Sequence, residues 1–177
     1  NTEGKREIVG LHIGPSEAEP FWSTFLKDLT RRGLTGVKLV ISDAHEGLKA
    51  AITRVLSATW QRCRVHFMRN ALTALPKGRQ EMVASVIRTI FAQPDAEHID
   101  AQFDEVVRMI ERVHPKTAVM LTDARDDILA FKAFPARHWR QIWSTNPLER
   151  LNREIKRRTD VVGVFPNNAA PVSYTHL

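Results

Sequence analysis

Hydrophobic and polar positions follow strand-like periods in the first third of the chain. Arg6–Ile13 is rich in β-branched residues and is bounded by glycine, which predicts a strand. Val37–Ile41 is apolar almost throughout, which is typical of a strand covered on both faces. A third strand is expected over Trp60–His66, partly exposed because of its glutamine and arginines. These runs predict a small sheet.

Helical periods separate these strands. Ser16 and Glu19 form a capping-box pattern, which predicts a helix with aromatic and aliphatic side chains on one face and an end at Gly33. A second helix is expected from about His45 to Leu56, with Leu48, Ile52, Val55 and Leu56 on its inner face. The first third of the chain is therefore predicted to alternate strands with helices.

A long helical block follows from Phe67 to about Ile142. A last helix is expected to begin near Pro147, with Asn146 as its N-cap. Strands with intervening helices, followed by such a block, predict an α/β fold that carries an all-helical insertion. Breaks in the block are expected at Pro76, Pro94, Pro115 and Pro135.

The chain is expected to divide into successive regions. Residues 1–66 would form the sheet and its helices, 67–143 the helical insertion, and 144–170 the region of the last helix. Residues 171–177 continue no periodicity, so we interpret them as a foreign or artefactual tail and leave them out of the fold prediction.

Positive charge is concentrated near the end of the chain. The 177 residues carry a net charge of +6, which favours polyanionic partners. Residues 137–158 hold seven Lys or Arg against two Glu, whereas residues 79–131 hold six basic against ten acidic residues. A basic segment of this kind is what a phosphate-binding surface requires.

Composition also narrows the class of protein. Cys63 is the single cysteine, which excludes an internal disulfide framework and a Cys-x-x-Cys zinc site. No apolar run approaches the roughly 20 residues of a membrane span. We therefore expect a cytoplasmic protein with no membrane partner.

Two carboxylates are the candidate metal-binding groups. Asp43 follows the apolar run that ends at Ile41, and ligand sites gather at the carboxyl ends of parallel strands. Carboxylate oxygens suit Mg²⁺ or Mn²⁺. The alternative for Asp43 is a helix N-cap. Glu149 lies in the first turn of the last helix, where it could instead complete a capping box with Asn146.

The face of the last helix that carries Glu149 is polar. An acid beside an amide and two cations is what a scissile phosphate would need, although a solvated helix face has the same pattern. The side chains that follow Glu149 on this face are Asn152, Arg153 and Lys156. The stripe expected to be buried beside them consists of Leu148, Leu151 and Ile155.

Cys63 and His66 form a Cys-x-x-His pair at the expected end of the third strand. A zinc site would need two further ligands, and the sequence supplies no obvious pair, so we favour a buried cysteine beside a hydrogen-bonded histidine. His66 could alternatively contact phosphate or position a carboxylate. Trp139 and Trp143 are interpreted as core residues, with stacking on bases as the alternative.

Three segments resemble the mutator-type bacterial insertion-sequence transposases. They are Ser42–Leu48, Trp60–Asn70 and Ser144–Arg158. The resemblance runs from about Gly4 to Ala170 and implies an RNase H-like core with an Asp-Asp-Glu triad and a helical insertion before the glutamate. It implies cleavage of double-stranded DNA at the element's ends and joining to target DNA, with two Mg²⁺ or Mn²⁺ ions in the intact site and a homo-oligomer on DNA.

The resemblance assigns roles to residues of this chain. Asp43 matches the second aspartate of the triad and Glu149 the glutamate, so both are expected to be catalytic and to bind metal. Lys156 matches a DNA-contacting residue, while Cys63 and His66 match a signature that assists the site, as Asn152 would. Further expected DNA contacts are Arg150, Arg153, Arg157 and Arg158.

The first aspartate of the triad is expected upstream of Arg6–Ile13, where no residue here can take its place. We therefore expect a partial core with two of three acids, which is inactive by itself. It should fold only marginally, because N-terminal strands at the centre of the sheet are missing. Two alternatives stay open: an RNase H-like nuclease without strand transfer, and a non-enzymatic DNA-binding remnant in which the two acids are only caps.

Overall fold

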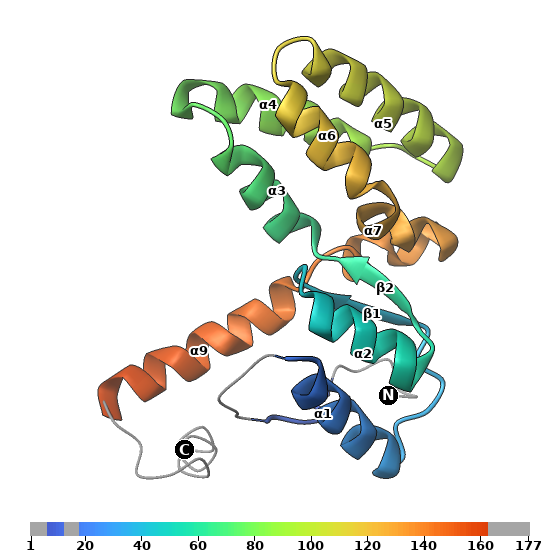
Figure 1. Cartoon of the computed structure of the whole chain (residues 1–177), viewed down its shortest axis with the longest axis vertical. Coiled ribbons are helices and arrows are strands. Elements are labelled where there is room, and N and C mark those ends of the chain that lie inside the picture. Colours follow the sequence, from blue (N-terminus) through green and yellow to red (C-terminus); the bar gives the residue numbers. More distant parts are fainter. Residues whose placement is uncertain (1–6, 13–17, 163–177) are drawn as a thin grey trace. The chain divides into compact units, whose positions relative to one another are not determined.

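The computed structural model describes residues 7–12 and 18–162 (Figure 1). By packing, the chain divides into two compact units. One consists of Asn1–Lys38, His45–Ala58 and Asn146–Leu177, and the other of Leu39–Ala44 and Thr59–Thr145. The domain boundaries expected from the sequence stay a prediction.

The first unit is built on two packed helices, α1 (Glu19–Arg31) and α2 (Glu46–Leu56). The helix α1 begins two residues later than a cap at Ser16 would require: its N-cap is Ala18, which makes no side-chain cap, and proline stands in its first turn. Instead, the carboxylate of Glu19 forms an ion pair with the guanidinium of Arg54 on α2, with an N–O distance of 2.7 Å. Gly33 follows the helix with a φ of 106°, as its predicted role as terminator requires.

The strand predicted over Arg6–Ile13 is wrong for the part that the structure describes. Residues 7–12 have no regular secondary structure, and Ile8 is 70% exposed. Two other residues of the segment contact α1: His12 lies edge-on to the Phe21 ring, and Gly10 lies against Phe25. Alternation of β-branched residues predicts a pleated surface but cannot supply the neighbouring strand whose hydrogen bonds define one.

The second unit contains a parallel pair of strands, β1 (Leu39–Ser42) and β2 (Thr59–Arg62). The register pairs Val40 with Trp60 and Ser42 with Arg62, and the Trp60 indole N–H donates to the Ser42 hydroxyl at 2.8 Å. The strand β1 is half-buried, so the expectation of cover on both faces is wrong. The fold is mixed α/β and mostly helical, with a two-stranded sheet in the described residues.

The strand β2 is shorter than predicted, because residues 64–66 belong to the helix α3 (Arg64–Thr73). Helices continue from there to residue 142, with prolines at or just before the breaks (Figure 1). A core of spaced apolar side chains joins them, among them Ile87, Phe103 and Phe131. The helices are α4 (Lys77–Ile90), α5 (Ala96–Glu111), α6 (Pro115–Asp123), α7 (Arg125–Leu129) and α8 (Trp139–Ile142), with short 3-10 turns η1 (Ala130–Ala133) and η2 (Ala136–His138) before α8.

A buried glutamine attaches β2 to this helical block. Gln61 is fully buried, and its amide donates to the carbonyls of Ile128 and Arg62 at 2.9 and 2.8 Å. Its amide oxygen accepts the backbone N–H of Phe131 at 2.8 Å. Buried polar groups are stable only when satisfied in this way, so Gln61 fixes the position of β2 against α7 and η1.

The last helix, α9 (Asn146–Val162), begins one residue before the predicted start at Pro147, so Asn146 is its first residue and not the N-cap before it. Its stripe of aliphatic side chains is only partly buried: Leu148 is 52% exposed, while Leu151 and Ile155 are half-buried. The prediction of a buried stripe is therefore wrong at its first position, since spacing shows which side chains share a face but not what covers them. No helix in residues 18–162 is both long and apolar enough to cross a membrane.

Candidate functional site: the junction of β1, β2 and α3

Three metal-ligating side chains meet where β1 and β2 end. One oxygen of Asp43, the Sγ of Cys63 and a ring nitrogen of His66 all lie within 4.8 Å of one another. Parallel pairing explains the meeting, because it brings both carboxyl ends to one edge, where the Cys63 N–H donates to the Ser42 carbonyl at 2.7 Å. Cys63 is the N-cap residue of α3, so three positions later His66 lies in the first turn.

Asp43 is not the cap of the helix that follows it. The N-cap of α2 is His45, whose Nδ1 accepts the Leu48 N–H at 3.3 Å. The Asp43 carboxylate is 54% exposed, and its Oδ1 is in direct contact with Nδ1 of His66, whose side chain is 22% exposed. The alternative in which Asp43 is merely a helix cap is therefore wrong, and its carboxylate faces solvent with one oxygen held.

The thiol of Cys63 contacts the segment that leads into α9. Its Sγ accepts the backbone N–H of Thr145 at 3.4 Å and the Thr145 hydroxyl at 3.3 Å. Next to it, the Arg64 N–H donates to the Trp143 carbonyl at 3.0 Å. The Arg64 guanidinium lies 3.8 Å from the Trp143 ring centroid and 5.1 Å from that of Phe91, and burial lowers its pKa while Cys63 acts in the opposite direction.

Both tryptophans of this region belong to the core, as predicted. Trp139 is 7% exposed, and its indole N–H donates to the Phe134 carbonyl at 2.7 Å. Trp143 is half-buried and meets the rings of Phe91 and Phe131 edge-on. Base stacking on Trp139 would require its exposure, so the packed interpretation holds for that residue.

The predicted DNA-contacting face of α9 is open to solvent. Glu149 is half-buried, while Asn152, Arg153 and Lys156 are exposed. Arg157 donates to Glu154 at 2.7 Å, and this hydrogen bond raises the pKa of the guanidinium. Arg150 is exposed as well, and the side chain of Arg158 lies outside the described residues, as do residues 171–177.

The donor set at the junction fits a divalent ion through its carboxylate. Asp43 supplies a hard oxygen to solvent, as Mg²⁺ and Mn²⁺ require. A zinc site would use a carboxylate oxygen of Asp43 together with Cys63 and His66, which supplies one of the two further ligands that the sequence left unidentified.

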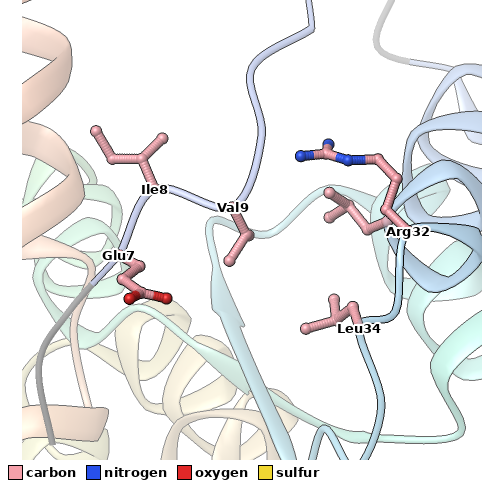
Figure 2. Close-up of a pocket in the computed structure, with 6 residues that line it drawn as sticks. Glu7, Ile8, Val9, Arg32 and Leu34 are labelled. Carbon is pink, nitrogen blue, oxygen red and sulfur yellow. The ribbon is translucent and has the colours of Figure 1, made fainter. Parts of the chain in front are cut away.

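A separate hollow of about 450 Å³ lies in the first unit. Figure 2 shows it between the segment of Glu7–Val9 and the segment that carries Arg32 and Leu34, with Val9 and Leu34 pointing toward each other across it. Its lining offers one acid and one base among aliphatic side chains. This lining does not include the cluster of three metal-ligating side chains, which in the described part of the chain lies where β1 and β2 end.

Comparison with known proteins decides the family. Residues 1–176 match the family model described as "Transposase, Mutator family". The chain belongs to the Mutator transposase family. The transposase for insertion sequence element IS1081 of Mycobacterium tuberculosis is 51% identical to it over 171 residues, which cover 96% of this chain and 41% of that protein.

Other members of the Mutator family are similar over the same region. The IS406 transposase of Burkholderia multivorans is 42% identical across 93% of this chain and 43% of its own length. The transposase of IS256 in transposon Tn4001 of Staphylococcus aureus is 37% identical across 95% of this chain and 44% of its own length. This chain therefore spans about two fifths of the length of these relatives.

The sequence of this Mutator family chain assigned no role to two residues at the junction or to the cap of α2. Thr145 and Arg64 hold the segment before α9, and His45 caps α2. Thr145 lies in one of the segments that resemble the family, but its partner could not be predicted because it is 82 positions away. His45 could have been recognised as the residue directly before the first helical turn, although histidine is not among the preferred caps.

Proposed function

We propose that the complete protein containing this chain is a transposase that cuts and joins double-stranded DNA with the help of divalent metal ions. The observation that carries the proposal is the placement of Asp43: its carboxylate follows β1, is half-exposed, and does not cap α2. Membership of the Mutator family supplies the reaction class. An RNase H-like core with an Asp-Asp-Glu triad is part of the same proposal.

In this proposal Asp43 and Glu149 hold Mg²⁺ or Mn²⁺. Bound ions would supply Lewis-acid stabilisation of a reacting phosphate and lower the pKa of water. Asp43 offers its second oxygen, because His66 occupies the first. The exposed cations of α9, Arg150, Arg153 and Lys156, would bind phosphate and so position the DNA beside Glu149.

The test is an assay of cleavage and strand transfer on labelled element ends with the complete protein and Mg²⁺ or Mn²⁺. We expect Asp43→Asn and Glu149→Gln to abolish both reactions, because an amide cannot replace a carboxylate ligand. Asp123→Asn, which changes an exposed acid at the end of α6, is the matched control and should keep full activity. Normal activity of Asp43→Asn would refute the proposal.

The same assay separates the alternative functions. Cleavage that depends on both acids but yields no joined product would identify a nuclease without strand transfer. DNA binding without cleavage, insensitive to both acids and lost in Lys156→Ala, would identify a DNA-binding remnant. That the 177 residues alone are inactive stays a prediction, to be checked by assaying this chain beside the complete protein.

A further inference from the structure

The Cys-x-x-His pair contacts two segments far apart in the sequence. His66 Nδ1 contacts Oδ1 of Asp43, directly after β1. Cys63 Sγ accepts two hydrogen bonds from Thr145, at 3.4 Å from its N–H and 3.3 Å from its hydroxyl. All four residues belong to the same compact unit. Thr145 immediately precedes α9, the helix whose first turn contains Glu149.

Backbone hydrogen bonds reinforce both connections. The Cys63 N–H donates to the Ser42 carbonyl at 2.7 Å, which fixes Cys63 beside the end of β1. The Arg64 N–H donates to the Trp143 carbonyl at 3.0 Å, and the Arg64 guanidinium covers the Trp143 ring. Backbone and side-chain contacts together therefore connect the turn from β2 into α3 to the end of β1 and to residues 143–145.

Resting on the proposed function, we infer that Cys63 and His66 are positioning residues for the two metal-binding carboxylates. His66 orients the Asp43 carboxylate, and Cys63 fixes Thr145 and with it the entry into the helix of Glu149. A hydrogen bond to one carboxylate oxygen restricts the rotation of the group and leaves the other oxygen to an ion. Partners of this kind fix the direction of a ligand's lone pairs, and their loss costs about 10- to 100-fold in metal affinity or activity.

The geometry favours this role over a zinc site made by the same side chains. Ligands of one tetrahedral zinc ion lie about 3.4 Å apart, given metal–ligand distances near 2.1 Å. His66 Nδ1 and Asp43 Oδ1 are instead in direct hydrogen-bond contact, with no space for an ion between them. Cys63 is fully buried and its Sγ receives both donors of Thr145. The Asp43 Oδ1, His66 Nδ1 and Cys63 Sγ atoms therefore already have partners within the protein.

The first test measures DNA cleavage by the complete protein as Mn²⁺ is titrated. We expect His66→Ala to raise the Mn²⁺ concentration at half-maximal rate by about tenfold or more. His66→Asn should restore most of this, because its amide N–H can take the place of Nδ1–H. A merely structural histidine would lower the melting temperature and leave the Mn²⁺ dependence unchanged, and that result would overturn the role of His66.

The second test addresses the contact with the α9 entry. Thr145→Val removes the hydroxyl donor and should lower the rate of cleavage and raise the Mn²⁺ concentration at half-maximal rate, by about tenfold in their combined effect. Thr145→Ser keeps the donor and should keep the rate. Cys63→Ser, which keeps an acceptor, should be more active than Cys63→Ala. Wild-type rates in Thr145→Val and Cys63→Ala would overturn the role of Cys63.

Two controls distinguish the possible failures. If Asp43→Asn cleaves like the wild type, the proposed function itself has failed. If Asp43→Asn is inactive while His66→Ala and Thr145→Val match the wild type, only the positioning role has failed. Titration with Co²⁺ gives a further check, since a thiolate-to-cobalt charge-transfer band that is lost in Cys63→Ser would show a metal held by the thiol and overturn the inference.

Discussion

The junction of β1, β2 and α3 carries the proposed carboxylate of Asp43 and the helix α9 carries that of Glu149, and the contacts described at the two places differ in range. At the junction, Cys63 and Thr145 are 82 positions apart, and Gln61 and Phe131 are 70 apart. On α9 an ion pair joins Glu154 to Arg157, three positions away. Long-range, buried contacts should therefore govern the geometry of Asp43, whereas α9 contributes the exposed cations Arg150, Arg153 and Lys156.

The largest effect on this comparison should come from the metal-binding carboxylate at the junction. Asp43→Asn in the complete protein should reduce the rate of DNA cleavage by at least about a thousandfold, because metal ions supply several kcal/mol of transition-state stabilisation. Single-turnover cleavage of element ends is the measurement. Loss of cleavage with unchanged DNA affinity would show that Asp43 acts in catalysis. An equal loss of DNA affinity would show that it acts in DNA binding, as α9 is proposed to do.

The buried amide behind the junction should have the next largest effect, on stability. Gln61→Leu leaves the Phe131 N–H and the Ile128 carbonyl unpaired in a buried site, and each unsatisfied group costs about 1–3 kcal/mol. We expect the free energy of unfolding, measured by urea denaturation, to fall by about 2–4 kcal/mol. Gln141→Leu, at an exposed position of α8, should change it by less than about 0.5 kcal/mol. Equal effects would show that Gln61 is not a structural link.

The exposed face of α9 should respond in binding and salt dependence. Lys156→Ala and Arg153→Ala should each weaken DNA binding several-fold and reduce the slope of log K against log salt concentration by about 0.9. Arg112→Ala, on the acidic helical block, should change neither. Fluorescence anisotropy across a salt series checks this. An unchanged slope in Lys156→Ala would remove this residue from the DNA interface.

The smallest effect concerns a local pair at the start of α5, which resembles the pairs on α9. The His98 N–H and ring hydrogen-bond to Asp95 and lower the pKa of that carboxyl, and Asp95 in turn raises the pKa of His98. The contribution of Asp95 should be lost as pH falls through its lowered pKa, below about 3.8, and that of His98 as pH rises through its raised pKa, above about 6.5.

Melting temperatures of the wild type and Asp95→Asn between pH 3 and 9 test this sign. The difference should be small, greatest between the two ordinary pKa values near 3.8 and 6.5, and smaller on either side. A difference that stays constant over this range would show that the pair makes no titratable contribution.

Periodicity predicted the elements that local side chains determine. The helical block, its breaks at proline and the approximate start of α9 follow from apolar spacing and from the positions of the prolines, and Asp43 follows β1 as expected. The strand over Arg6–Ile13 and the exposure of Leu148 were wrong, because both depend on a neighbour that spacing does not reveal. The strand β2 ends at Arg62 because Cys63 is the N-cap of α3, whose helical hydrogen bonds then pair the backbone groups.

The sequence predicted which residues form the candidate site, but not which residues contact one another there. The sequence indicated Asp43 and the pair of Cys63 and His66, with contact between His66 and a carboxylate as one alternative. That Asp43 is the partner depends on the parallel register of Ser42 with Arg62, which no spacing contains. Thr145 became visible only through its contact with the thiol. Polar residues that meet through long-range packing therefore need the structure, whereas the charged face of α9 could be read from its helical period.

The most direct test of the metal-binding role is to measure Mn²⁺ binding to the complete protein by the electron paramagnetic resonance signal of the free ion. The account predicts that the wild type and Asp123→Asn bind Mn²⁺ alike, and that Asp43→Asn and Glu149→Gln each weaken the same site by tenfold or more, roughly the loss that follows removal of a metal-site group. Mn²⁺ affinity that is unchanged in both variants would contradict the claim that these carboxylates hold the catalytic ions.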